Sequence, residues 1–384
     1  MNHVCLVSEQ AMPNFLPVLN KSLRPETVTL VVSSKMTSRA AWLRSEIERQ
    51  QVRVLDDILI GDEVADLNGI QKKLIEWADA HKELVARSIL NVTGGTKPMA
   101  IAAQEVFRMM DRPVFYVDVA TDVVTWVSGV RENVSLTKQP TLNQFFGLNG
   151  VVANGAFKSV VENEKWRFFG DEIAKRIQEF SRPLGRLNYW AAKSVEDMER
   201  ARDLKAQRQS LLFLYGKQEL SLGNWQNLLD MLHAHELIAG DYGNERFISE
   251  SAARFCAGAW LEHYVFVMLK KLGFDKRHAM MNVEIKDVWG NRNEFDSIVL
   301  SRNNCFVIED KTRNMKIGKQ NNAADNAIYK LAHLTRQMGL RTHGILVSAR
   351  PLRPVDCDRA RAVGISVIDY LPDLEKELKR IVGC

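Results

Sequence analysis

The stretch EFDSIVLSRNNCFVIEDKT, residues 294–312, carries several acids and a lysine at a spacing that could do chemistry. Residues two apart on a strand share a face, so Glu309 and Lys311 should project together while Asp310 points the other way. Asp296 lies on the preceding predicted strand, across a Ser-Arg-Asn-Asn turn, and can reach the same face. Asp296 and Glu309 would then offer the carboxylate oxygens that Mg²⁺ or Mn²⁺ prefers. With Lys311 to help activate a water or neutralise the phosphate, this set predicts phosphodiester hydrolysis.

The same pattern has a simpler interpretation, because a Glu and a Lys two apart on a strand usually belong to a solvated face. The apolar run before Glu309 argues against it, since a carboxylate at the end of a buried strand is costly unless a metal or a partner compensates. Glu262 lies in the otherwise apolar helical stretch GAWLEHYVFVMLKKLGF. Its alternative role is that of a capped or solvent-reaching structural residue.

A second chemical feature, NVTGGTKPMA, spans residues 91–100. Gly94 and Gly95 permit close approach of backbone N–H groups to an anion, and the helix N-terminus that follows adds partial positive charge. The stretch matches neither the Walker A pattern nor the dinucleotide pattern GxGxxG, which disfavours an ATPase or a dehydrogenase. The hydroxyls of Thr93 and Thr96 and the charge of Lys97 still predict an anion-binding turn. The alternative is a strand-to-helix connection without a ligand.

These residues need a framework, and the first 130 or so residues alternate between strand and helix patterns. The β-branched run at residues 28–34 suits a buried parallel strand, and residues 38–50, 69–81 and 97–110 carry apolar residues at helical spacing. This order predicts an α/β fold with a Rossmann-like sheet that helices cover on both faces. Such sheets bind ligands at the carboxyl ends of their strands, where the turns at Ser8 and at residues 93–97 would lie.

An Asn- and Gly-rich stretch at residues 141–155 marks a boundary. The helix-rich, charged region after it ends in a helix and a hairpin-like stretch, which could form a small winged-helix element, a structural connector or a dimerisation arm. A second α/β pattern follows. We therefore expect a Rossmann-like domain at residues 1–145, a linker and helical, winged-helix-like region at residues 146–250, and an α/β domain at residues 251–384.

Composition sets outer limits on function. The 384 residues carry 52 Lys plus Arg against 47 Asp plus Glu, and a net charge of +5 does not by itself indicate nucleic-acid binding. The five cysteines lack zinc-finger spacing, so free thiols in a reducing cytoplasm are the simplest expectation. No signal peptide and no membrane-spanning run is evident, so we expect a cytoplasmic protein without membrane contact.

The hairpin residues resemble the PD-(D/E)xK nuclease core, with Phe295-Asp296 in place of the proline-aspartate pair. The resemblance implies a restriction-endonuclease-like domain in which Glu262, Asp296 and Glu309 bind Mn²⁺ or Mg²⁺ and Lys311 assists the nucleophile. In one respect this sequence departs from the pattern. The middle residue of the ExK motif is Asp310, where an apolar side chain would face the core more comfortably.

The turn resembles the Asn-x-Thr-Gly-Gly-Thr-Lys motif of the CRISPR-associated Rossmann-fold (CARF) domains. That resemblance implies a homodimer whose paired domains bind a cyclic oligoadenylate, with cyclic tetra-adenylate as the expected ligand, in a symmetric site that activates the attached effector. The implied ligand-binding residues are Ser8, Ser33, Ser34, Asn91, Thr93, Gly94, Gly95, Thr96 and Lys97.

Together the two resemblances predict a cyclic oligoadenylate-activated, metal-dependent nuclease that cuts DNA, RNA or both in type III CRISPR antiviral defence. Two other hypotheses stay open. One is a ligand-responsive DNA-binding regulator with an inactive nuclease-like domain, and the other is a nuclease without an allosteric ligand. Activator-dependent cleavage separates the three.

Overall fold

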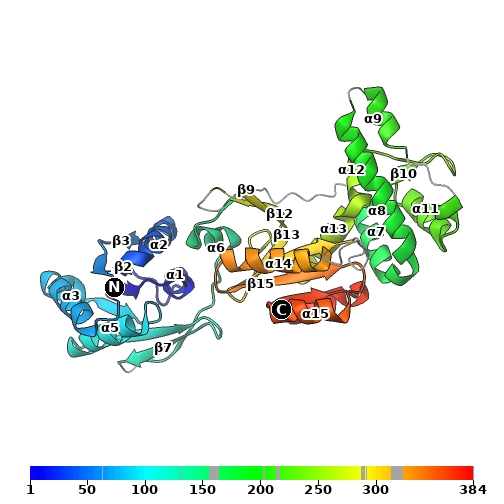
Figure 1. The fold of residues 1–384 in the computed structure, drawn as a ribbon. Coiled ribbons are helices and arrows are strands. Elements are labelled where there is room, and N and C mark those ends of the chain that lie inside the picture. Colours follow the sequence, from blue (N-terminus) through cyan, green and yellow to red (C-terminus); the bar gives the residue numbers. More distant parts are fainter. Residues whose placement is uncertain are drawn as a thin grey trace.

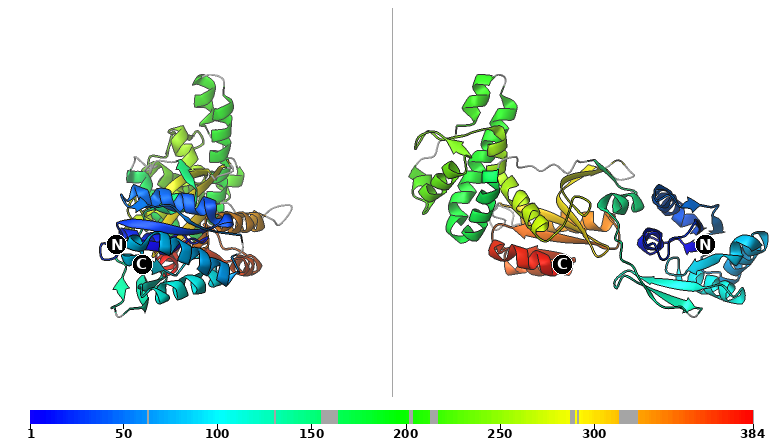
Figure 2. Two further views of the ribbon diagram at one scale, coloured as in Figure 1. Left: turned by 90° about the vertical axis from the view of Figure 1, so that its left-hand side faces the viewer. Right: turned by 180° about the vertical axis from the view of Figure 1, so that it is seen from behind.

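The computed structural model describes residues 1–62, 64–129, 131–154, 164–201, 204–212, 217–286, 290, 292–312 and 323–383. Three bodies follow one another along an elongated molecule (Figure 1). An N-terminal α/β domain lies at one end, a second α/β domain lies in the middle, and a helical body lies at the other end. The two further views in Figure 2 show the same order.

The N-terminal domain is built on an eight-stranded sheet in the order β3-β2-β1-β5-β6-β7-β8, with β4 also paired to β2. Strands β1 to β6 run parallel, and β7 and β8 are antiparallel additions. The strands are β1 (Asn2–Leu6), β2 (Thr27–Ser33), β3 (Arg53–Val54), β4 (Ile58–Gly61), β5 (Ser88–Asn91), β6 (Val114–Asp118), β7 (Val123–Ser128) and β8 (Val134–Ser135).

Helices cover both faces of this sheet, as the alternation of buried side chains along β1 requires. Cys5 packs in the core that contains α1 and α2, whereas Val4 and Leu6 pack in the core that contains α3 and α5. The predicted Rossmann-like arrangement is confirmed. The helices are α1 (Met12–Leu19), a short 3₁₀ turn (Ser34–Met36), α2 (Thr37–Arg49), α3 (Leu67–Ala80), α4 (Lys82–Ala86), α5 (Lys97–Met109) and α6 (Leu142–Leu148).

The second α/β domain has a six-stranded sheet in the order β16-β15-β14-β13-β12-β9. The hairpin β13–β14 is antiparallel, while β14, β15 and β16 are parallel. Strand β9 comes from the region expected as linker, yet it pairs with β12 at the edge. The strands are β9 (Val152–Asn154), β12 (Ala279–Lys286), β13 (Arg292–Ser301), β14 (Asn304–Lys311), β15 (Thr342–Ser348) and β16 (Ile365–Ile368).

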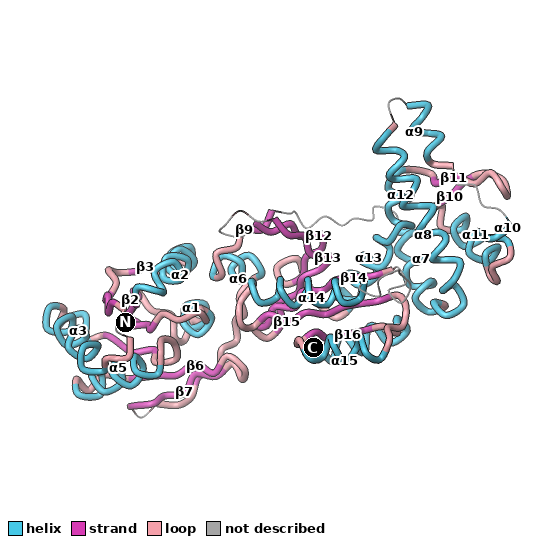
Figure 3. Tube along the Cα trace, in the orientation of Figure 1, coloured by secondary structure: helices cyan, strands magenta, loops and turns pink. Residues whose placement is uncertain are grey.

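Helices α13 and α14 pack on opposite faces of this second sheet, and Figure 3 shows α14 running alongside β15. Helix α13 shares its core with α7, α8 and α11, so the helical body and this domain pack together. The helices of this domain are α13 (Trp260–Lys271), α14 (Ala323–Gln337), α15 (Pro354–Ala362), a 3₁₀ turn (Leu371–Asp373) and α16 (Leu374–Val382).

The helical body includes the predicted helix followed by a hairpin, namely α11 and the short antiparallel pair β10–β11. A π-helical turn (Phe255–Ala259) joins α12 to α13. Within the described residues, every helix is too short or too polar to cross a membrane. The elements of the body are α7 (Glu164–Lys175), α8 (Ile177–Arg200), α9 (Leu204–Ser210), α10 (Lys217–Leu220), α11 (Trp225–Ala234), β10 (Ile238–Ala239), β11 (Arg246–Phe247) and α12 (Glu250–Arg254).

Candidate functional site

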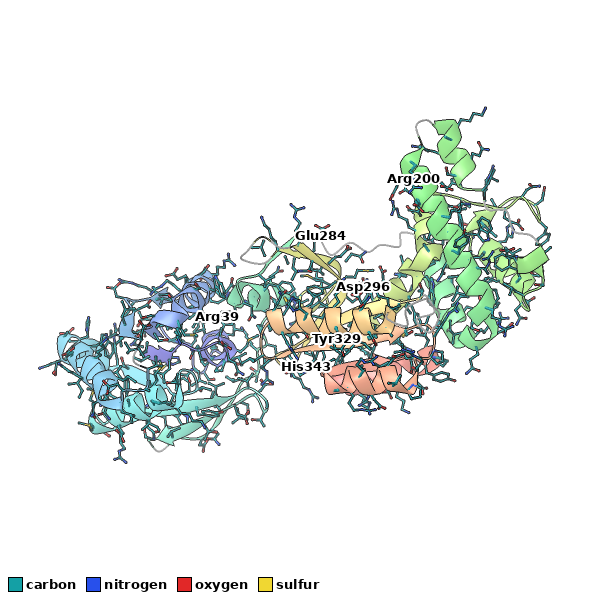
Figure 4. The ribbon with its side chains drawn as sticks, viewed as in Figure 1. Arg39, Arg200, Glu284, Asp296, Tyr329 and His343 are labelled. Carbon is teal, nitrogen blue, oxygen red and sulfur yellow. The ribbon has the colours of Figure 1, made fainter. Side chains whose placement is uncertain are left out.

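The acids and the lysine of the β13–β14 hairpin gather at the end of the sheet that faces the helical body. Figure 4 labels Asp296 at this end. Ser297 pairs with Ile308 in the antiparallel register, which brings Asp296 beside the carboxyl end of β14. Asp296 Oδ2 accepts a hydrogen bond of 2.7 Å from the backbone N–H of Asp310. Lys311 Nζ donates to Glu309 Oε1, so these two side chains project together as predicted.

Asp310 is the residue whose importance the sequence pattern missed. Ile308 packs in the core that contains α13, and Val307 packs in the core that contains α14. Because strand residues alternate, Asp310 lies on the α13 side and Glu309 on the α14 side. The α13 side also holds Glu262. Both carboxylate oxygens of Asp310 are buried and have no hydrogen-bond partner among the described residues.

The electrostatics of the cluster show that its acids repel one another. Burial, followed by the charge of Asp296, raises the pKa of Glu262 from 4.5 to about 7, although Lys311 opposes the change. Burial and the charge of Glu309 raise the pKa of Asp296. Burial also raises the pKa of Asp310 well above its ordinary value, with the charges of Asp296 and Glu262 adding to it. A group of acids this costly to ionise is typical of a site that binds a cation.

The predicted trio of Glu262, Asp296 and Glu309 is not assembled as one metal-binding group. Among the described residues, no three His, Cys, Asp or Glu side chains lie at metal-binding spacing. Along β14, Glu309 is paired with Lys311, two residues away. The acid that the strand turns toward Glu262 is Asp310.

A cleft of about 980 Å³ opens beside these residues, lined by Glu262, Asp310 and Lys311 together with residues of α8. The π-helical turn ahead of α13 forms part of its wall through Ala257 and Gly258. Turns of this kind inside helices occur often at functional sites. The cleft therefore places the buried Asp310, the half-buried Glu262 and a lysine where a substrate can reach them.

The residues expected to bind a ligand in the N-terminal domain also meet at one place. Strand β1 lies between β2 and β5, so the carboxyl ends of these three strands are neighbours. At these ends lie Ser8, Ser33 as the last residue of β2, Ser34, and the turn at residues 93–97. Thr96 caps α5 by accepting from the N–H of Met99, and Lys97 is exposed as the first residue of that helix. The edge combines hydroxyls, a lysine and a helix N-terminus.

The turn itself is held by hydrogen bonds of the Asn91 and Thr93 side chains. Asn91 is fully buried, and its amide donates to Pro13 O and Asn14 Oδ1. Thr93 Oγ1 donates to Asn91 Oδ1 and accepts from the N–H of Val117. Asn91 and Thr93 thus shape the turn through internal hydrogen bonds. A side chain at Gly94 would collide with the carbonyl oxygen of Leu6, so only glycine lets the turn lie this close to β1.

A contact between the two α/β domains lies at the turn of the β13–β14 hairpin. The β13–β14 turn contains Arg302 and Asn303, both with positive φ. Asn303 is fully buried, and its amide donates to Asp122 in the β6–β7 turn of the N-terminal domain. Arg341 Nε donates to Asn303 O at 3.3 Å. The hairpin that carries the acids thus touches the N-terminal domain directly.

Family models match both the N-terminal domain and the C-terminal domain of the chain. Residues 2–143 match the family model of the Card1 CARF domain, and residues 249–382 match that of the Card1-like endonuclease domain. The chain belongs to the CARF-domain nucleases. The predicted family, the CARF and endonuclease folds and the endonuclease assignment are confirmed. Comparison with curated proteins finds no match.

Solved structures resemble this CARF-domain nuclease along its whole length. Protein VC1899 from Vibrio cholerae is 23% identical with a TM-score of 0.86, covering 100% of this chain and 98% of that one. Can2 from Sulfobacillus thermosulfidooxidans, solved in complex with cyclic tetra-adenylate, is 25% identical with a TM-score of 0.77, covering 100% and 97%. A type III CRISPR defence DNA nuclease activated by cyclic oligoadenylate is 18% identical with a TM-score of 0.56, covering 99% of this chain and 52% of that one.

Proposed function

We propose that this CARF-domain nuclease cuts DNA, RNA or both, with Mn²⁺ or Mg²⁺, when cyclic tetra-adenylate binds the CARF domains of a homodimer in type III CRISPR defence. One observation carries the proposal. A cleft in the endonuclease domain holds Glu262, Asp310 and Lys311, and the same chain carries a Card1 CARF domain. The likeness to Can2 with its bound cyclic tetra-adenylate supports this choice of activator.

The residues of the cleft fit a divalent cation. Both oxygens of Asp310 are buried without a described partner, and a buried carboxylate in that state is costly unless a cation or a donor approaches it. We assign Asp310 and Glu262, the two acids that line the cleft, as the residues that would hold the ion, with waters and substrate oxygens as its remaining ligands. When bound, the ion supplies positive charge for the scissile phosphate and acidity for the attacking water.

The chain's own side chains then perform defined tasks. Lys311, which Glu309 holds in place, lines the cleft with its ammonium ready to neutralise charge on a non-bridging phosphate oxygen. Burial raises the pKa of Glu262 to about 7 without an ion, and a bound cation would favour the ionised carboxylate that holds it. Asp296 fixes the end of β14 through its bond to the N–H of Asp310.

The activator site is the edge formed by the ends of β1, β2 and β5. Thr96, Lys97 and Ser34 are exposed there, while Ser8 is half-buried. A cyclic ligand with two-fold symmetry suits a pair of such edges related by a two-fold axis, which is why a homodimer belongs to the proposal. Asn91, Thr93, Gly94 and Gly95 keep the turn in shape.

The contact between Asp122 and Asn303 could couple activator binding in the CARF domain to the acids of the cleft. Strand β14 runs from Asn304 beside this contact to Lys311 in the cleft, a span of roughly 25 Å at the usual strand rise. Because a strand is stiff along its length, a shift of the β6–β7 turn moves the acids at the other end. To switch cleavage on, the activator has to bind more tightly to the arrangement of the two domains in which the acids are placed for cleavage.

The test is cleavage by the full-length protein with Mn²⁺ and cyclic tetra-adenylate, read on labelled single-stranded DNA, duplex DNA and RNA. We expect Lys311→Ala and Glu309→Ala to abolish cleavage and to bind the activator as tightly as the unchanged protein. Lys330→Ala, an exposed lysine on α14, is the matched control and should cut normally. Normal cutting by either active-site variant would show that this assignment of the site is wrong.

A further inference from the structure

The cleft is also lined by basic residues, to which the proposed cation site gives no role. Opposite the end of β14, helix α8 contributes Arg186 and Tyr189, and the segment after β15 contributes Arg350. Arg186 is already paired with Glu219. Arg350 is different, because no described acid forms an ion pair with it and its Nε and Nη2 atoms are buried without a hydrogen-bond partner in the described part of the chain.

The backbone of Arg350 is fixed next to the active-site strand. The N–H of Ala349 donates to Lys311 O at 2.9 Å, which ties the end of β15 to the end of β14. Ser348 Oγ donates to Arg350 O at 2.7 Å and accepts from the N–H of Arg350. The side chain therefore starts from a rigid point two residues beyond a strand that runs parallel to β14.

The guanidinium of Arg350 lies against helix α8 at Gly185, which has no side chain. A Cβ atom added to Gly185 would lie 2.5 Å from Nη2 of Arg350, so any larger residue would push the guanidinium away. A glycine inside a helix ordinarily destabilises it relative to alanine. Here it leaves room for a buried cation, and burial lowers the pKa of Arg350.

Burying two nitrogens of a guanidinium without a counter-charge is costly, and an anion in the cleft would reduce that cost. The planar fork of arginine matches two oxygens of a phosphate at once, which lysine cannot do. The nearby acids Glu262 and Asp310 repel any anion unless a cation lies beside them, and a phosphate strand with its divalent cation meets that condition. A nucleic-acid strand that spans the cleft can place one phosphate at Arg350 and another at the cation beside Glu262 and Asp310.

We propose that Arg350 is a substrate-binding residue that holds a phosphate of the nucleic-acid strand next to the scissile one, with Gly185 shaped to admit its guanidinium. The proposal rests on the proposed nuclease function of the same cleft. It adds a binding subsite formed by α8 and the segment after β15, outside the motif of the β13–β14 hairpin. Its ligand is a backbone phosphate, so it contributes affinity without a preference for sequence.

The experiment measures binding of a fluorescent single-stranded oligonucleotide to full-length protein with Mn²⁺ and cyclic tetra-adenylate, in a Lys311→Ala background that prevents cleavage. We expect Arg350→Ala to weaken binding about ten- to hundredfold, as loss of a charge-assisted phosphate contact does. The slope of log affinity against log salt should fall by about 0.7, the value for one phosphate on a single strand. Arg350→Lys should recover part of the affinity.

Two further variants keep the test independent of folding. Gly185→Ala retains every charge and should favour the helix, yet it should weaken binding because it displaces the guanidinium. Arg361→Ala removes an exposed arginine of α15 and should bind normally. The unfolding temperature of Arg350→Ala should not fall, since the lost charge had no described partner.

The proposal is overturned if Arg350→Ala binds with unchanged affinity and salt slope, or if it unfolds at a lower temperature while Gly185→Ala binds normally. Cleavage by the otherwise unchanged protein is measured in parallel. No cleavage at any condition would refute the nuclease, whereas normal cleavage together with normal binding by Arg350→Ala would refute this subsite alone. Weaker binding by both Arg350→Ala and Gly185→Ala supports it.

Discussion

Replacing Glu262 by glutamine should stabilise the metal-free protein at neutral pH and leave it unchanged in acid. Burial and the charge of Asp296 raise the pKa of Glu262 from 4.5 to about 7. Below pH 4.5 the carboxyl is protonated in both the folded and the unfolded chain, so it has no effect on stability. As the pH rises to 7, the unfolded chain ionises first and the folded state loses stability. The loss reaches about 3 kcal/mol above pH 7.

The glutamine variant removes this loss, so its advantage should grow from zero near pH 4.5 to about 3 kcal/mol at pH 8, roughly 6 to 12 °C in unfolding midpoint for a domain of this size. Thermal unfolding in the presence of a chelator measures it. Glu284→Gln on β12 is the control, because Glu284 is exposed, and Figure 4 labels both Glu284 and Asp296. Added Mn²⁺ should stabilise the unchanged protein more than Glu262→Gln. Equal or lower stability of Glu262→Gln at pH 8 would refute the inference that its surroundings raise the pKa of Glu262.

Three further substitutions test the CARF domain and its link to the cleft. Gly94→Ala should lower the unfolding temperature and abolish cyclic tetra-adenylate binding in calorimetry, because its Cβ collides with Leu6 O; binding at normal affinity would contradict the turn geometry. Lys97→Ala should weaken activator binding about tenfold without a change in unfolding temperature, since the lysine is exposed; unchanged affinity would remove Lys97 from the site. Asn303→Ala should bind the activator normally but respond with a lower cleavage rate, because the Asp122 contact is lost; a normal response would exclude this route.

The α/β folds and the two site regions could be predicted from the sequence because the patterns that indicate them are local. Alternating strand and helix patterns predict the CARF fold, and the glycine turn and the hairpin acids identify the two regions where chemistry is expected. Glu309 and Lys311 project together because their spacing on a strand decides it. These inferences need only neighbouring residues and the period of the backbone.

Features that depend on distant packing were not predictable. Asp310 looked like a misplaced core residue, and only the position of α13 against β14 shows that it meets Glu262 at the cleft. Arg350 lies far from the hairpin in sequence, and no motif marks a buried arginine that lacks a partner. The motif predicts that Asn91 binds the ligand, yet its amide group donates hydrogen bonds to other residues of the fold. Strand β9 pairs with β12 across more than 120 residues.

The central claim is that a ligand at the glycine turn switches chemistry in the distant cleft. The most direct measurement is the initial rate of cleavage with Mn²⁺ as cyclic tetra-adenylate is titrated, for the unchanged protein and for Lys97→Ala. We predict no cleavage without activator, a saturable rise with it, and a curve for Lys97→Ala that shifts to about tenfold higher activator concentration with the same maximum. Cleavage that ignores the activator, or activator binding with no cleavage at any concentration, would contradict the account.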